Sequence, residues 1–227
     1  MASDQTTLQR GMTLLEVLII IAVLCFLAAT LLPALSRTGR ASNQRRIVCL
    51  TNLKQIGLGF DMFAGDHHQK FPMQVSTNEG GSREYLVSED LFRHFAAVSE
   101  QLVTPRMLTC PVDPLKERVT DFSRLANRNI SYFLGLDSVR GEPNSFLSGD
   151  RTLTIRSMSS PGTVLLATNS VAKWAEGIHY RSKQFLPGRE FMGQVAFADG
   201  SVRRLSQTDL AELVKASSPA TNRIMIP

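Results

Sequence analysis

The N-terminal part of the chain carries two consecutive apolar patterns. Residues 12–32, MTLLEVLIIIAVLCFLAATLL, contain one charged residue, Glu16, and match the length of a helix that crosses a hydrocarbon core about 30 Å thick. Beyond this run, apolar residues recur at helical spacing, at positions 47, 50, 53, 56, 60 and 63. The two patterns predict one long helix from Met12 to about Phe63, which Pro33 kinks but does not end.

The rest of the chain, residues 66–227, mixes helical and alternating patterns. The segments are 88–102, with Ser88 as a candidate N-cap, and 206–214 for helices, and 130–136, 153–155 and 163–167 for strands. The clearest hairpin is 195–205, where Asp199 and Gly200 favour the positive φ angles of a type I′ turn. These patterns predict an α+β head packed on the long helix.

Composition fits one globular domain with an anchor. The chain has 227 residues, of which 43% are hydrophobic and 20% charged. Its net charge is +5 and its pI is about 9.4, but aromatic residues make up 7% and the Lys and Arg residues are scattered. No basic and aromatic surface of the kind that binds nucleic acids is therefore expected.

A short polar leader, MASDQTTLQRG, precedes the apolar run. A secretory signal peptide would carry its small-residue cleavage site on the far side of the run, and the sequence LLPALSRTGRAS shows no clean site there. The string GMTLLEV, residues 11–17, resembles the processing site of type IV prepilins and type II secretion pseudopilins. The resemblance implies cleavage of residues 1–11 after Gly11, N-methylation of Met12, which replaces the usual Phe, and an assembly role for Glu16. Pro33 stands where many pilins carry a helix-kinking proline.

The position of Glu16 has a physical reason in such an assembly. A carboxylate inside an apolar segment is costly unless it is paired. The methylated amine at Met12 of one subunit stays cationic and could pair with Glu16 of its neighbour. The alternative is a snorkelling or protonated Glu16 in a simple membrane anchor.

The head adds to the resemblance. The segments CLTNLKQIG (49–57), CPVD (110–113) and FADG (197–200) look like those of a bacterial prepilin-like group that ends in a histidine-containing DG motif. In this chain, Arg189 and Ser201 replace the expected histidines, so a function tied to them is not carried over. The implied fold is pilin-like, with a helix at 12–36 that spans the membrane, its continuation at 37–65 and an antiparallel β-sheet head at 66–227.

Three cysteines are too few for a disulfide scaffold. Cys25 lies inside the apolar run, where inert packing is expected. Cys49 and Cys110 could pair if the head is exported to an oxidising compartment.

Metal and catalytic sites are not expected. The histidines lack ligand spacing and are expected in surface loops, and turn formation is a commoner role than calcium binding for the loop aspartates. These residues are His67, His68, His94 and His179, and Asp113, Asp137, Asp150 and Asp199. No GxSxG, HExxH or P-loop motif occurs, so we expect no cofactor and no enzyme activity.

The expected function is a structural subunit of a type IV pilus or a type II secretion pseudopilus. Its implied partners are a prepilin peptidase, other pilin or pseudopilin subunits and an inner-membrane assembly platform. The resemblance places the chain in the inner membrane, as a single-pass protein with its head outside the cytoplasm. The positive-inside rule alone favours the reverse, because Arg37, Arg40, Arg45 and Arg46 follow the run. The alternative function is a membrane-anchored binding protein that does not polymerise.

Overall fold

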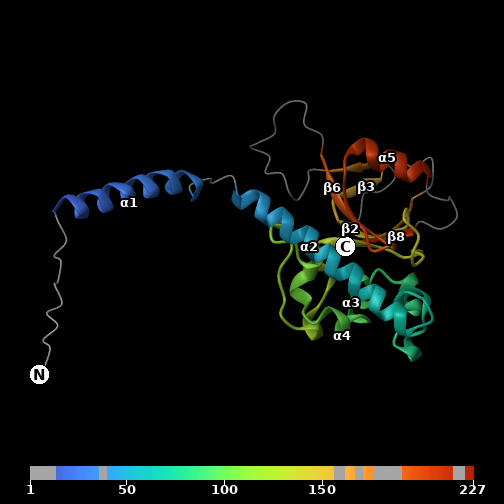
Figure 1. Ribbon diagram of the computed structural model, residues 1–227. Helices are drawn as coiled ribbons and strands as arrows, with labels where there is room; N and C mark the ends of the chain where they lie inside the picture. Colours follow the sequence, from blue (N-terminus) through green and yellow to red (C-terminus); the bar gives the residue numbers. More distant parts are fainter. Residues whose placement is uncertain (1–13, 36–39, 156–161, 167–170, 176–190, 217–222) are drawn as a thin grey trace, which may run out of the picture. The chain divides into compact units, whose positions relative to one another are not determined.

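The computed structural model describes residues 14–35, 40–155, 162–166, 171–175, 191–216 and 223–227, without the side chains of 30–35 and 40–46 (Figure 1). The chain divides into two compact units, Met1–Asn43 and Gln44–Pro227. Gly11, Met12, Arg189 and His179 lie outside the described residues.

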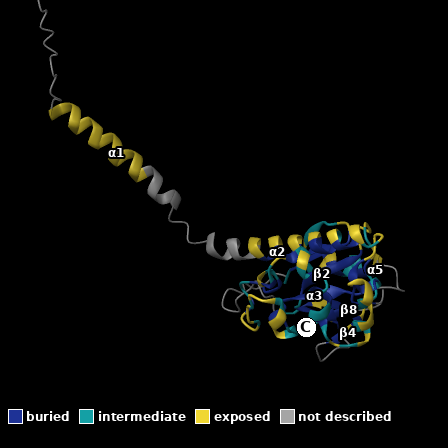
Figure 2. Cartoon of the chain, turned by 90° about the horizontal axis from the view of Figure 1, so that it is seen from below, coloured by how far each residue is buried: buried dark blue, intermediate teal, exposed yellow. Residues whose placement is uncertain are grey.

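Helix α1, Leu14–Leu35, accounts for most of the first unit. Its described side chains, from Leu14 to Ala29, are all exposed (Figure 2). Pro33 lies within the helix, near its end. Among the described residues, no helix combines the length and apolar character needed to cross a membrane. The expected span, 12–32, begins and ends outside the part of α1 whose side chains are described.

Helix α2, Arg40–Asp66, covers most of the expected continuation at 37–65. It ends because His68 and Gln69 adopt positive φ angles of 54° and 65°. The Gln69 N–H then donates to the Ala64 carbonyl at 2.8 Å, which satisfies one of the carbonyls left open at a helix end.

The head contains further short helices and two sheets. The α-helices are α3 (Leu91–Ala96), α4 (Ser99–Leu102) and α5 (Gln207–Ala216). The 3₁₀ helices are η1 (Pro72–Gln74), η2 (Thr77–Glu79), η3 (Arg83–Val87), η4 (Pro105–Leu108), η5 (Phe122–Arg124) and η6 (Asn127–Asn129). The strands are β1 (Tyr132–Gly135), β2 (Phe146–Asp150), β3 (Leu153–Ile155), β4 (Gly162–Leu165), β5 (Ala172–Trp174), β6 (Gly193–Phe197), β7 (Val202–Leu205) and β8 (Arg223–Ile226).

The main sheet has six strands in the order β4-β8-β1-β2-β6-β7, and β3 pairs with β5 in a second sheet. Every strand pair is antiparallel. Successive side chains of a strand point to opposite faces, and Tyr132 and Leu134 accordingly join one core while Phe133 joins another. The first core is shared with α2, and the second with α5 and the small sheet. The α+β class expected from the sequence is therefore present.

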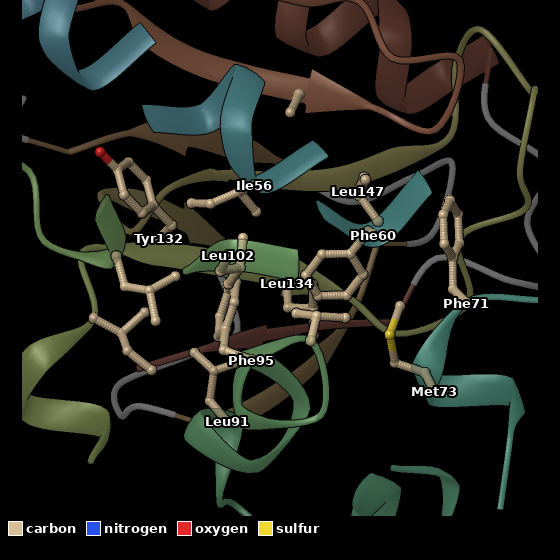
Figure 3. Packing of buried hydrophobic residues seen from close by; sticks show 14 of the residues in the cluster. Ile56, Phe60, Phe71, Met73, Leu91, Phe95, Leu102, Tyr132, Leu134 and Leu147 are labelled. Atoms are coloured by element: carbon tan, nitrogen blue, oxygen red, sulfur yellow. The ribbon is translucent and has the colours of Figure 1, made fainter. Parts of the chain in front are cut away.

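The α2 side of the sheet holds a tightly packed apolar core (Figure 3). Ile56 and Phe60 of α2 are completely buried there. The Phe60 ring meets Phe71 and Phe95 edge to face, at centroid distances of 6.2 and 5.8 Å. Burial of large apolar side chains is the main favourable term in folding, so this contact fixes α2 to the head.

Two local predictions are wrong. The expected helix from Ser88 to Leu102 begins only at Leu91, because the Ser88 hydroxyl accepts from the Asp90 N–H at 3.3 Å in a turn before α3. It is then split into α3 and α4, because Val98 leaves the helical region. The expected type I′ turn is also absent, because Gly200 has a positive φ of 78° and Asp199 does not. The Gly200 N–H donates to Phe197 at 3.0 Å, and residues 198–200 form a three-residue loop that ends in the left-handed glycine.

Candidate functional site

The predicted assembly residue, Glu16, lies in the first turn of α1 and is exposed. Apolar side chains surround it along the helix, with Leu14 at 82% and Phe26 at 70% exposure. A helix that is apolar on all sides is normally buried on all sides, in a protein core or a membrane.

Helix α2 has two different faces. Its inner face buries Leu53, Ile56 and Phe60 completely. Its outer face carries Ile47, Leu58 and Met62, which are 62%, 57% and 50% exposed. The apolar positions used to predict α2 therefore include the outer residue Ile47, which packing inside the head does not explain.

A disulfide joins Cys49 of α2 to Cys110, which follows η4. Their Cα atoms are 5.3 Å apart, and both residues are buried. The pairing that the sequence left open is thus present in the structure. Cys25 is exposed in α1 within the single chain, and its packing in a membrane or filament stays a prediction.

Besides the disulfide at Cys110, an ion pair at Asp113 also anchors the CPVD segment. The Arg151 guanidinium donates to both carboxylate oxygens at 2.7 and 2.8 Å, and the Asp113 side chain is fully buried. Burial acts to raise the pKa of Asp113, but the hydrogen bonds and charge of Arg151 outweigh it and leave the pKa below its ordinary value. Bidentate pairs of this kind combine strength with fixed geometry. Cys110 and Asp113 therefore fasten one segment to α2 and to the turn after β2.

The DG hairpin contacts α2 as well. The Lys54 ammonium donates to the Gly200 carbonyl at 2.5 Å. The Asp199 carboxylate accepts from the Ser201 N–H at 2.8 Å, and it lies 3.7 Å from the Arg203 guanidinium. Ser201, which replaces a histidine of the resembling group, thus takes part in the turn itself. These contacts give the motif a structural role in positioning the hairpin.

The histidines do not gather into a site. His94 is completely buried, contrary to the surface position expected for it, because α3 turns it toward the core. Its Nδ1 lies 2.7 Å from the Ser82 hydroxyl, and burial lowers its pKa to about 4. His67 stacks on Phe63 at the end of α2, and His68 is exposed.

The remaining loop aspartates bind neighbouring groups of the head. Asp137 accepts a fork of hydrogen bonds from Arg223, at 2.6 to 3.2 Å, and Asp150 accepts from the Gln194 N–H at 2.8 Å. No group of three or more His, Cys, Asp or Glu side chains suited to a metal ion occurs in the described part of the chain.

Sequence reasoning missed the partners of these residues. Arg151 is 38 residues from Asp113, and Arg223 is 86 residues from Asp137. Separations of this size leave no periodic signal in a single sequence. The contact between Lys54 and Gly200 was equally hidden, although Lys54 lies inside the CLTNLKQIG segment, residues 49–57.

Comparison with known proteins finds no family model, no curated protein and no solved structure that matches the chain.

Proposed function

We propose that this chain is a structural subunit of a type IV pilus or a type II secretion pseudopilus. One observation carries the proposal: an apolar helix, exposed along its described side chains, holds a single carboxylate, Glu16, in its first turn. In the proposed pathway the helix first inserts into the inner membrane. A prepilin peptidase then removes residues 1–11 and methylates Met12, and an assembly platform adds the subunit to others.

The chemistry of α1 supports assembly rather than simple anchoring. Apolar side chains account for insertion into lipid, but they do not account for a carboxylate, which is costly in an apolar medium. A cationic amine at Met12 of a neighbouring subunit would neutralise Glu16 in the filament. Because both charges are then desolvated together, the pair would also fix the axial register between subunits.

The disulfide supports a head outside the cytoplasm. Disulfides form and persist in oxidising compartments and are rare where thiols are kept reduced. The Cys49–Cys110 bond is buried within the head. In the proposed topology this bond outweighs the arginines after the apolar run, because the positive-inside rule is a statistical preference.

The ion pairs of the head support a structural role. Asp113 with Arg151, Asp137 with Arg223 and Asp61 with Arg140 each connect segments that are distant in the sequence. Each pair holds a loop in place. The head therefore contributes a rigid contact surface in this proposal.

Substitution of Glu16 tests the proposal. We expect Glu16→Ala to be processed normally but to enter filaments about tenfold less than the wild type, because the Met12 amine loses its partner, a change that corresponds to about 1.4 kcal/mol. Glu100→Ala, at an exposed position in α4, is the control. Wild-type incorporation of Glu16→Ala would contradict the charge-pairing role.

The alternative, an anchored binding protein that does not polymerise, has one observation in its favour. The Arg93 guanidinium lies over the rings of Tyr85 and Phe92, at 4.6 and 5.2 Å from their centroids, and aromatic residues and Arg are enriched in protein interfaces. Cross-linking between engineered cysteines in α1 separates the two functions. Linked copies support a filament, whereas processed but unlinked protein supports the binding protein.

A further inference from the structure

The ring of His67 contacts two backbone carbonyls, one through each of its nitrogens. Its Nδ1 lies 2.8 Å from the Phe63 carbonyl oxygen, and its Nε2 lies 3.1 Å from the Glu79 carbonyl oxygen. A carbonyl oxygen only accepts hydrogen bonds, so both ring nitrogens must donate if both contacts are hydrogen bonds. A neutral imidazole carries one N–H group, and an imidazolium carries two. The two contacts together therefore require the protonated form of His67.

The end of α2 favours a positive charge at this position. Asp66 is the last residue of the helix, so His67 follows at its C-terminus, where the helix dipole favours cations. The Phe63 carbonyl is one of the last four of the helix, which lack partners within it, and histidine side chains can bond such carbonyls. The His67 ring also stacks on the Phe63 ring at a centroid distance of 3.9 Å, and the face of an aromatic ring attracts a cation.

The second carbonyl belongs to the loop at residues 76–81, which we call the η2 loop. Its start is fixed by Glu84, whose carboxylate accepts from the Thr77 N–H and the Ser76 hydroxyl at 2.8 Å each. These bonds lower the pKa of Glu84 to about 2, so they persist through the pH range in which histidine ordinarily titrates. The contact from His67 then joins this loop to the end of α2.

The other charged groups of these segments are of types that ordinarily do not titrate between pH 5.5 and 8.5, with one exception. They are Asp66, His68 and Lys70 at the end of α2 and after it, and Glu79, Arg83 and Glu84 in the η2 loop and after it. The exception is His68, which is exposed. A change of charge in this range therefore belongs to His67 or His68, and the two can be separated by substitution.

We propose that a proton on His67 fastens the η2 loop to the end of α2, and that the loop is released when this proton leaves. In the neutral form, Nδ1 keeps the shorter hydrogen bond, to the Phe63 carbonyl. The lone pair of Nε2 then faces the Glu79 carbonyl oxygen and repels it. The head thus contains a pH-sensitive switch that opens as the pH rises. This switch goes beyond the proposed function and operates whether or not the chain assembles.

The protonation state of His67 can be measured from nitrogen-15 chemical shifts of the full chain in detergent, labelled at histidine. We expect N–H groups on both ring nitrogens at pH 5.5 and on Nδ1 alone at pH 8.5. His67→Phe, which keeps a ring beside Phe63, identifies the signals, and His67→Gln does so if that variant does not fold. His94, whose pKa burial lowers to about 4, is a reference that stays neutral at both pH values. A single N–H on His67 at pH 5.5, or a neutral form protonated on Nε2, would overturn the inference.

Hydrogen exchange measures the release of the η2 loop. The Gly81 N–H donates to the Ser76 carbonyl within the loop at 2.8 Å. Its protection, corrected for the intrinsic effect of pH, should be about fivefold lower at pH 8.5 than at pH 5.5, as expected when one hydrogen bond is lost. His67→Phe should show the lower protection at both pH values.

His68→Asn is the matched control for this experiment. His68 adjoins His67, is exposed and has a positive φ of 54°, which asparagine tolerates. The variant should keep the pH dependence of the wild type. Protection of the η2 loop that does not change with pH in the wild type, or that changes equally in His67→Phe, would overturn the inference while the proposed function stands.

Discussion

Two buried titratable residues of the head, His94 and Asp113, avoid the cost of an unpaired buried charge in different ways. His94 is held without charge, and burial keeps its pKa near 4. Asp113 is held as an anion because Arg151 donates to both of its oxygens. Burying an ionisable group is costly unless the group is neutral or paired, and each residue follows one of these routes. The stability of the head therefore depends on a neutral His94 and on the ion pair between Asp113 and Arg151.

His94 should make the head sensitive to mild acid. Its pKa is about 4 in the folded chain and ordinarily 6.5, so the unfolded chain binds more protons between these values. The contribution is fully present above pH 6.5 and is lost as the pH falls toward 4, by about 3 kcal/mol in total. Urea unfolding of wild type and His94→Gln at pH 7 and pH 4.5 should show a smaller pH effect in the variant.

The control for His94 is Leu91→Ala, which removes a buried side chain from the same helix. It should lower the free energy of unfolding at both pH values and keep the wild-type pH dependence. Equal pH dependence in the wild type and His94→Gln would show that His94 does not stay neutral in the fold.

Replacing Asp113 should lower the free energy of unfolding far more than replacing an exposed aspartate that also pairs with an arginine. We expect Asp113→Asn to lower the free energy of unfolding by about 2 to 4 kcal/mol, because it leaves the half-buried Arg151 without its anion. The matched control is Asp90→Asn, whose pair with Arg93 is 2.9 Å long but exposed, and it should cost less than about 1 kcal/mol. Equal losses in chemical denaturation would contradict the role of burial.

At the residue scale, the sequence indicated which cysteines could pair, but it did not predict the burial of His94 or the partner of Asp113. It indicated that Cys49 and Cys110 could pair in an oxidising compartment, because these are the two cysteines that lie outside the apolar run. It misplaced His94, because a six-residue helix such as α3 shows no clear periodicity from which to infer its buried face. It also gave no sign of Arg151, whose contact with Asp113 depends on the tertiary fold.

At the scale of elements, α2 is the support on which the head is built. The sheet packs on its inner face through Ile56 and Phe60, and Cys49 ties it to the CPVD segment. Lys54 connects it to the DG hairpin. The CLTNLKQIG, CPVD and FADG segments thus meet at α2: the first is part of the helix, and the other two are bonded to it through Cys49 and Lys54.

Removal of the disulfide tests this support. We expect the double variant Cys49→Ala, Cys110→Ala to lose about 4 kcal/mol of unfolding free energy, the value for a closed loop of about 60 residues in the chain-entropy model. The sequence separation is 61. Dithiothreitol should shift the urea midpoint of the wild type similarly and leave that of the variant unchanged. A wild-type midpoint that does not respond to dithiothreitol would contradict the account.

Element prediction succeeded where a regular pattern was present, and it missed the strands β2 and β8. Helices α2 and α5 follow sustained helical spacing, and the 195–205 hairpin alternates clearly. Strand β2 reads FLSGD, with two residues, Gly149 and Asp150, that disfavour strands. Strand β8 has four residues and gains its place between β4 and β1 from pairing across the sheet, which no local pattern shows.

At the scale of the whole molecule, a compact disulfide-bonded head follows a helix with opposite surface properties. The head buries its apolar residues in two cores, whereas the described part of α1 exposes them (Figure 2). The α+β class of the head could be predicted from the sequence, while its six-strand order could not, because strand order depends on distant pairings. The assembly function remains a proposal that rests on α1, Glu16 and the GMTLLEV string.

The intact mass of the mature chain tests the central claim most directly. The chain is extracted from cells that contain a prepilin peptidase and measured by mass spectrometry. The account predicts the loss of residues 1–11 and the gain of one methyl group on the amine of Met12. Retention of residues 1–11 in those cells would contradict it.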